Sequence, residues 1–187
     1  SIPSLNTQYD SPKDIHTFLN SHGIFFDQWN CDIVFDDDAT QEEILAAYSK
    51  DLVPFMKNSG YKTADVISIN ATTENYSSLR TKFLAEHTHS EDEIRFFVDG
   101  EGFFWFNLEN DTVFNVLCQR GDLISVPAGK KHWFDAGKEN PFVKAIRIFI
   151  DVSGWIPDYT GSNIEDNYKN FKLKKIILLS LYKNIFQ

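Results

Sequence analysis

Apolar and polar positions follow a helical spacing in the first part of this 187-residue chain and change to short alternating runs near residue 61. Ser11-Pro12 predicts a helix start, and Gly23 predicts its end. A capping box at Thr40–Glu43 predicts the start of a second helix, which Pro54 should break or kink before it stops at 59–60. Between the two helices, residues 25–35 indicate a strand or an extended segment.

From residue 61 onward, short β-type runs are separated by turn residues. Many closely spaced strands without helices between them predict an antiparallel barrel or a double-sheet jelly roll. A tight turn at Gly100–Gly102 should join two aromatic-rich strands, and residues 154–170 should wrap the outside with a short helix near 163–169. We expect strands near 64–69, 80–89, 93–98, 102–107, 112–118, 122–126, 131–135 and 142–150.

Length and composition favour one mainly β domain over residues 1–170, including an N-terminal helical segment of about 1–62. The 42% hydrophobic content is sufficient for a buried core. Residues 171–187 differ, because they carry four lysines and no acid. Their apolar run at 176–182 is far shorter than the ~20 residues of a membrane span. This basic extension either touches a membrane surface or partner, or it folds back or frays, and the second alternative is favoured. Its role is left open.

The net charge of −9 argues against nucleic acid and anionic membranes as partners. Cys31 and Cys118 lie far apart and form no CxxC pair, so we interpret them as reduced thiols of a cytosolic protein. The polar stretch Ser1–Asp10 lacks the apolar core of a signal peptide. We therefore expect a cytoplasmic location.

Candidate chemistry gathers where three of the five histidines lie, at His87, His89 and His132, together with Glu93. Three imidazoles and one carboxylate suit a divalent transition metal of the iron or nickel type. On an extended strand, His87 and His89 share a face, and Glu93 keeps that parity if the strand resumes after a short excursion. His132 would arrive from a distant strand through a Pro-x-Gly turn.

Any one of these histidines taken alone is better explained by ordinary hydrogen bonding, and His16 and His22 on or after the first helix favour surface or capping roles. The combined spacing reverses this judgement. His-x-His, Glu at +4 and Gly100, followed by Gly-x5-Pro-x-Gly-x2-His over 121–132, resembles the two-part cupin signature. Thr81 and Ala136 stand where that pattern often has Gly and Asn, but neither position supplies a ligand.

The resemblance is closer than the superfamily, because several stretches are similar to the acireductone dioxygenase family of the bacterial type. It implies a cupin fold, a role in methionine salvage, and O2 with a small-molecule acireductone (1,2-dihydroxy-3-keto-5-methylthiopentene) as substrates. One Fe(II) per chain would yield formate and 4-methylthio-2-oxobutanoate, and Ni(II) would yield formate, CO and 3-methylthiopropionate. By match of motif, the ligands would be His87, His89, Glu93 and His132. The similar stretches are 43–48, 64–67, 83–100, 121–135, 144–149, 154–155 and 159–161.

Four protein ligands leave two positions of an octahedron for a chelating enediolate, and the metal then acts as a Lewis acid and template. Arg95 shares the ligand face, where it either pairs with a developing oxyanion or orients Glu93 through a buried salt bridge. Arg147 lies in an apolar strand and is a candidate for a second catalytic or substrate contact. The apolar tail of the substrate needs a wall, for which Phe83, Phe134 and Trp155 are candidates; ordinary core packing is the alternative.

Two other functions stay open. A cupin isomerase would polarise a sugar carbonyl without consuming O2, but it would favour a more polar pocket. A non-catalytic cupin would only bind a metal or a small molecule, and such proteins often lack one ligand. Metal content separates the third function from the two enzymes, and O2 uptake separates those two. The sequence does not choose between iron and nickel, and nothing in it demands more than a monomer.

Overall fold

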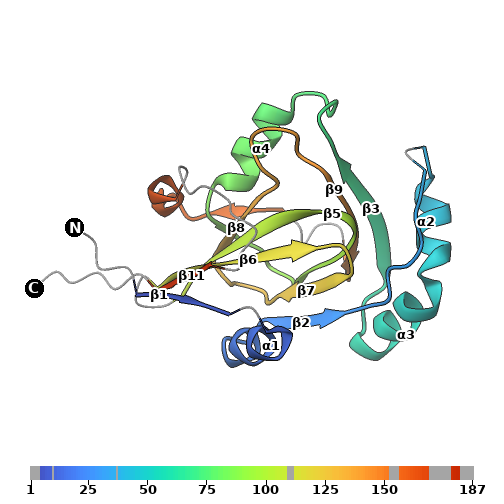
Figure 1. The fold of residues 1–187 in the computed structure, drawn as a ribbon, viewed down its shortest axis with the longest axis horizontal. Coiled ribbons are helices and arrows are strands. Elements are labelled where there is room, and N and C mark those ends of the chain that lie inside the picture. Colours follow the sequence, from blue (N-terminus) through green and yellow to red (C-terminus); the bar gives the residue numbers. More distant parts are fainter. Residues whose placement is uncertain are drawn as a thin grey trace, which may run out of the picture.

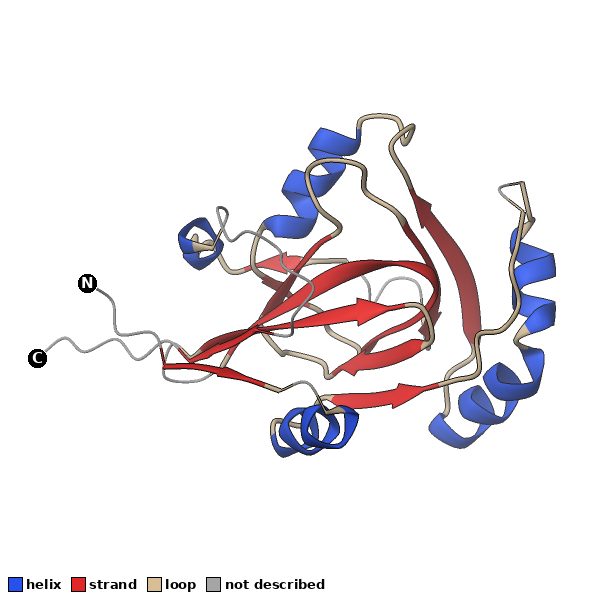
Figure 2. Ribbon diagram, viewed as in Figure 1, coloured by secondary structure: helices blue, strands red, loops and turns tan. Residues whose placement is uncertain are grey.

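The computed structural model describes residues 5–9, 11–36, 38–108, 112–151, 156–168 and 178–181. Its centre is a barrel of antiparallel strands, with helices on the outside (Figures 1 and 2). The helices are α1 (Pro12–Ser21), α2 (Gln41–Ala47), α3 (Ser49–Ser59), α4 (Tyr76–Leu84) and a 3-10 helix (Ile164–Asn167). The strands are β1 (Leu5–Gln8), β2 (Phe25–Gln28), β3 (Thr63–Ile69), β4 (His87–Thr88), β5 (Glu93–Asn107), β6 (Val113–Gln119), β7 (Asp122–Val126), β8 (His132–Asp135), β9 (Val143–Phe149), β10 (Asp158–Tyr159) and β11 (Leu178–Leu181).

Strand β5 belongs to both walls of the barrel. Its first half pairs with β7 and β9, which extend to β2 and β3, and its second half pairs with β6 and β8, which extend to β4 and β10. Two antiparallel sheets that share one long strand form the expected cupin jelly roll. The fold class predicted from the sequence is confirmed.

The predicted turn at Gly100–Gly102 is wrong, because β5 runs through it as one strand of 15 residues. The pairing with β9 shifts between Phe97 and Asp99, and the strand bends there from one sheet into the other. Gly100 has a φ of +73°, and a Cβ there would collide with the carbonyl oxygen of Phe142. A Cβ at Gly102 would collide with the ring of Phe134. The glycines are needed for close packing rather than for a reversal of the chain.

The predicted strand at 80–89 is also wrong over most of its length. Residues 76–84 form α4, and only His87–Thr88 pair as a strand. Leu79 and Phe83 lie one helical turn apart and both line the cavity described below, so tertiary contacts favour the helix. Arg80 on the same helix forms a salt bridge to Asp135 at 2.7 Å, which ties α4 to β8.

Pro54 does not end or break its helix, because α3 continues through it to Ser59. The helical segment is instead divided at Tyr48, between α2 and α3. Tyr48 is 2% exposed, and its ring packs 4.8 Å from that of Phe96, so the corner is held by the core. The Thr40 capping box, the Gly60 stop and the short helix near 163–169 are confirmed, while only Phe25–Gln28 of the segment 25–35 form a strand.

The described part of the C-terminal extension folds back onto the N-terminus. Leu178–Leu181 pair antiparallel with Leu5–Gln8 as β11 and β1. The favoured alternative for this segment therefore holds over those four residues, and the domain boundary at residue 170 stays a prediction. None of the described helices is long and apolar enough to cross a membrane.

Candidate metal centre

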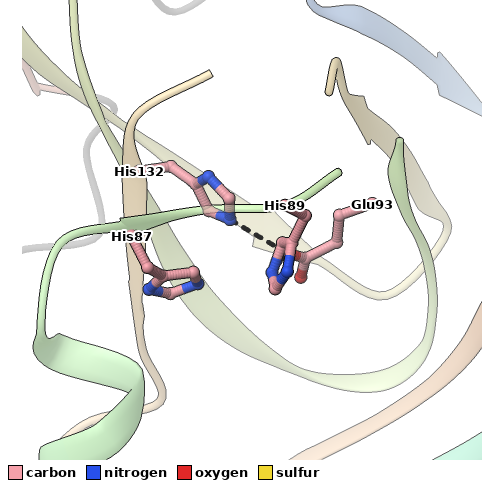
Figure 3. Close-up of side chains that lie close together, drawn as sticks. All are labelled: His87, His89, Glu93 and His132. Atoms are coloured by element: carbon pink, nitrogen blue, oxygen red, sulfur yellow. Dashed lines mark hydrogen bonds and ion pairs between the residues drawn. The ribbon is translucent and has the colours of Figure 1, made fainter. Parts of the chain in front are cut away.

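The side chains of four residues from separate segments of the chain lie close together, as Figure 3 shows. His87 lies on β4, His89 follows it, Glu93 begins β5 and His132 begins β8. His87 and His132 are register partners across β4 and β8. All four residues are buried, and one ligand atom from each lies within 4.8 Å of the others. Residues 45 positions apart in sequence are thus brought to one point by strand pairing.

Backbone carbonyls fix the orientation of two of the imidazoles. Nδ1 of His87 lies 2.7 Å from the carbonyl oxygen of Ala85, and Nδ1 of His132 lies 2.7 Å from that of Lys130. An Nδ1–H that donates to a carbonyl leaves Nε2 as the basic nitrogen. For His132, this Nε2 lies 2.9 Å from Oε2 of Glu93. The same oxygen lies 3.0 Å from Nε2 of His89.

For His87 and Glu93, burial and nearby charges favour the protonation states that a metal requires. Burial, together with the nearby His132, lowers the pKa of His87 to about 4, so its imidazole is neutral at pH 7. For Glu93, burial alone would raise the pKa, but the Arg95 charge and the contacts with the imidazoles of His132 and His89 outweigh it. The pKa of Glu93 is therefore well below its usual value, and its side chain is a carboxylate.

The four side chains of His87, His89, Glu93 and His132 suit one divalent transition metal. Three buried imidazoles and an ionised carboxylate, with one ligand atom of each within 4.8 Å of the others, are donors that such a metal accepts. The backbone contacts of His87 and His132 are the outer-shell support that ligating histidines have in metal sites.

A cavity of about 400 Å³ opens directly onto this cluster. Apolar side chains from α4 form one part of its wall, and residues just before and within β10 form another. Its basic groups come from α4, β5 and β9. The lining consists of Leu79, Lys82, Phe83, His87, His89, Arg95, Arg147, Ile156, Pro157 and Tyr159. A small anionic molecule with an apolar end fits this combination of groups.

The model of the ARD/ARD' family matches residues 4–157 of the chain. The chain belongs to the ARD/ARD' family. It is 58% identical over 162 residues to the acireductone dioxygenase of Picosynechococcus sp. (87% of this chain and 92% of that one). It is 50% identical over 158 residues to that of Gluconobacter oxydans (84% and 83%). A solved structure of the acireductone dioxygenase from Bacillus anthracis, with a cadmium ion in its active centre, is 36% identical, covers 84% of this chain and 95% of its own, and has a TM-score of 0.75.

In this ARD/ARD' family member, Arg95 is close to both the cluster and the cavity. It is 4% exposed, and its Nε donates to Oε1 of Glu93 at 2.6 Å. Its guanidinium carbon lies 5.4 Å from the ring centre of Phe134 and 5.8 Å from that of Phe104. The salt bridge between Arg95 and Glu93 that the sequence suggested is present. Because Arg95 also lines the cavity, a catalytic role for its guanidinium remains open.

Arg147 lies on β9 directly opposite Arg95 and pairs with Asp65 of β3. It lines the cavity, as the sequence suggested, but its charge is shared with this carboxylate. The side chains of Arg147 and Asp65 are each 27% exposed, so this pair lies toward the mouth.

The candidates for the apolar wall have three outcomes. Phe83 lines the cavity. Phe134 is outside the lining; it is 2% exposed in the core and reaches the site through its contact with Arg95. Trp155 lies outside the described residues. As expected, His16 and His22 are away from the cluster, on and just after α1, where His22 packs against Phe18.

Sequence reasoning missed Leu79, Lys82, Ile156, Pro157 and Tyr159 as cavity residues. The wrong strand at 80–89 hid Lys82 and the helix that carries Leu79, and a helical i, i+4 pairing of Leu79 with Phe83 was the signal available. The residues around β10 lie far along the chain, and Ile156 and Pro157 fall outside the stretches that resemble the family. The pairing of β10 with β4 and the hydrogen bonds from Thr160 and Ser162 to Glu86 bring this segment to the site.

Proposed function

We propose that this protein is a metal-dependent dioxygenase that cleaves acireductone with O2 in methionine salvage. One observation carries the proposal: three histidines and a glutamate converge beside a cavity that His87 and His89 line together with basic and apolar side chains. Membership of the ARD/ARD' family supports the same activity. The ligands in this proposal are His87, His89, Glu93 and His132, and the metal is Fe(II) or Ni(II), one per chain.

The bound metal would supply Lewis-acid and template chemistry for the enediolate of the substrate. The residues around it do the remaining work. Arg95 and Arg147 place two guanidinium groups on one side of the cavity, where they attract and orient an anionic substrate. Arg95 is the closer of the two, and it can stabilise negative charge that develops on a substrate oxygen during cleavage.

Glu93 has a double role in this proposal. Its Oε1 accepts from Arg95, and its Oε2 faces His89 and His132. The carboxylate therefore holds the guanidinium in place beside the metal position while serving as a ligand itself. Its low pKa keeps it ionised throughout the working range.

The apolar part of the cavity accounts for the methylthio tail. Leu79, Phe83, Ile156 and Pro157 provide surface that gains from contact with a thioether chain. A sugar isomerase would require a wall that hydrogen-bonds several hydroxyl groups, and these four side chains offer no hydrogen bond.

We further propose that the enzyme acts as a cytoplasmic monomer.

The experiment is anaerobic loading of the metal-free protein with Fe(II) or Ni(II), followed by O2 uptake with acireductone and product analysis. We expect formate and 4-methylthio-2-oxobutanoate with iron, and formate, CO and 3-methylthiopropionate with nickel. Turnover at the enzyme-free rate with both metals, while metal still binds, would reject the proposal in favour of an isomerase or a binding cupin. A chain that binds neither metal would reject the ligand set.

A further inference from the structure

Glu86, the residue before His87, carries a buried carboxylate that the proposed chemistry does not use. It is 2% exposed. Across the ranges that the structure describes, no Lys, Arg or His forms an ion pair with it. Burying a carboxylate without a cation is unfavourable unless hydrogen bonds replace its water. The position of those hydrogen bonds therefore indicates what Glu86 holds.

Hydroxyl groups from one segment satisfy one oxygen of this carboxylate. Thr160 Oγ1 donates to Oε1 at 2.6 Å, and Ser162 Oγ donates to the same atom at 2.7 Å. The amide of Thr160 also donates to the backbone carbonyl of Glu86 at 3.0 Å. The other oxygen, Oε2, accepts from Nδ2 of Asn107 at the end of β5, at 2.7 Å. Glu86 thus joins β4, β5 and the chain around β10.

The segment held in this way, residues 156–162, forms part of the cavity wall; we call it the wall segment. Ile156, Pro157 and Tyr159 line the cavity, and the Tyr159 ring lies 5.9 Å from that of His87. Ile156 is 72% exposed, so its own packing does little to hold it. The pairing of β10 with β4 covers only two residues. The hydrogen bonds to Glu86 are therefore a large part of the attachment.

We propose that Glu86 is a positioning residue that latches the wall segment beside the metal cluster and so sets specificity for the apolar tail of the substrate. This inference rests on the proposed function. When these hydrogen bonds are formed, Ile156 and Pro157 line the cavity together with Leu79 and Phe83, and these four side chains provide the apolar contact for the tail. When these hydrogen bonds are broken, the four candidate ligands keep their arrangement, because other contacts hold them. His87 and His132 contact backbone carbonyls, and Glu93 contacts His89 and His132.

The test is the double variant Thr160→Val/Ser162→Ala, which removes both hydroxyl donors and changes no cavity-lining residue. We expect KM for the methylthio acireductone to rise about tenfold, because a smaller fraction of the enzyme has its wall in place. The kcat and the metal content should stay at the wild-type values. An acireductone that ends in a methyl group instead of the methylthioethyl chain should show the same KM with both proteins.

Two further variants and a direct readout make the test specific. Ser162→Thr keeps a hydroxyl and should retain the wild-type KM, as should Asp158→Asn, which changes an exposed side chain of the same segment. Hydrogen exchange at the Thr160 amide should be faster in the double variant. If the double variant fails to fold, Ser162→Ala alone should show the same changes at smaller size.

An equal rise in KM for both substrates, or a loss of metal, would overturn the proposal, as would unchanged exchange at Thr160. If the wild-type protein does not turn over acireductone, the proposed function fails. The exchange experiment still decides in that case whether Glu86 latches the wall segment.

Discussion

Two arginine–carboxylate pairs lie on neighbouring strands at the same cavity and differ in burial. Arg95 and Arg147 are direct cross-strand partners on β5 and β9, an arrangement that is unfavourable for like charges without compensation. Each has its own carboxylate: Glu93 for Arg95 and Asp65 for Arg147. The side chains of the inner pair are 5% and 3% exposed, and those of the outer pair are 27% exposed.

Because the two pairs differ in burial, we expect the Arg95–Glu93 pair and the Arg147–Asp65 pair to have different roles. Water can replace either partner of the outer pair, so that pair tunes the cavity mouth at low energetic cost. The inner pair is almost completely buried, and Glu93 also faces His89 and His132. Loss of its charge therefore disturbs Arg95 and the metal cluster together.

The largest effect should come from Glu93→Gln. This change leaves the Arg95 charge buried without its carboxylate, which we expect to lower the free energy of unfolding of the metal-free protein by about 3–5 kcal/mol. Metal content after loading should fall to background. Chemical denaturation and elemental analysis measure the two quantities. The matched control is Asp65→Asn, which should keep the metal and cost about 1 kcal/mol or less; equal losses in the two variants would remove the distinction between the pairs.

The next largest effect should be a pH dependence of stability that arises from His87, one of the buried residues beside the inner pair. The pKa of His87 is about 4 in the folded chain, below its ordinary value of 6.5. The unfolded chain therefore binds a proton between pH 6.5 and 4 that the folded chain does not. The stability of the metal-free protein should fall by about 3 kcal/mol as the pH decreases through this window. Urea denaturation at several pH values measures it, and His87→Gln should flatten the slope; an equally steep slope in that variant would assign it to other groups.

Arg95→Lys distinguishes the catalytic role of Arg95 from a supporting one. Lysine keeps the positive charge beside Glu93 but loses the planar group that can reach a substrate oxygen. We expect kcat to fall roughly 100-fold with full metal content. Metal loss in proportion to the activity loss would instead assign Arg95 to the support of Glu93.

The smallest effect should follow from Arg147→Ala, at the outer pair. Because Arg147 is partly exposed and shares its charge with Asp65, its loss should lower kcat/KM about tenfold, mainly through KM. Steady-state O2 uptake at varied acireductone concentration measures this. A kcat defect as large as that of Arg95→Lys would show that both arginines act on the reacting atoms.

The four candidate ligands were predictable because few sequences have histidines and a glutamate at this spacing. His-x-His with Glu at +4 and a distant His after Pro-x-Gly gave the four residues, and most strand boundaries followed from β-type runs. The errors fell where tertiary contacts override local pattern. Gly100 and Gly102 suggest a reversal in sequence, but in the barrel they permit a bend against Phe142 and Phe134.

The cavity wall was less predictable than its floor. Apolar residues at 79–84 fit either a strand or a helix by composition, and the choice depends on the cavity that α4 covers. Ile156 and Pro157 lie outside the family-like stretches, and together with Tyr159 they reach the site through strand pairing and through Glu86. The residues that form a ligand set can thus be recognised from short sequence motifs, whereas the shape of the cavity beside them depends on the whole fold.

We propose that one metal ion, held by His87, His89, Glu93 and His132, supports the cleavage of acireductone by O2. An anaerobic titration of the metal-free protein with Fe(II), with O2 uptake recorded after each addition, tests this proposal. We expect the rate to rise linearly and to stop at one metal per chain, and the Glu93→Gln variant should stay at the enzyme-free rate throughout. Uptake by the metal-free protein above the enzyme-free rate, or a rate that saturates at another stoichiometry, would refute the proposed single metal site.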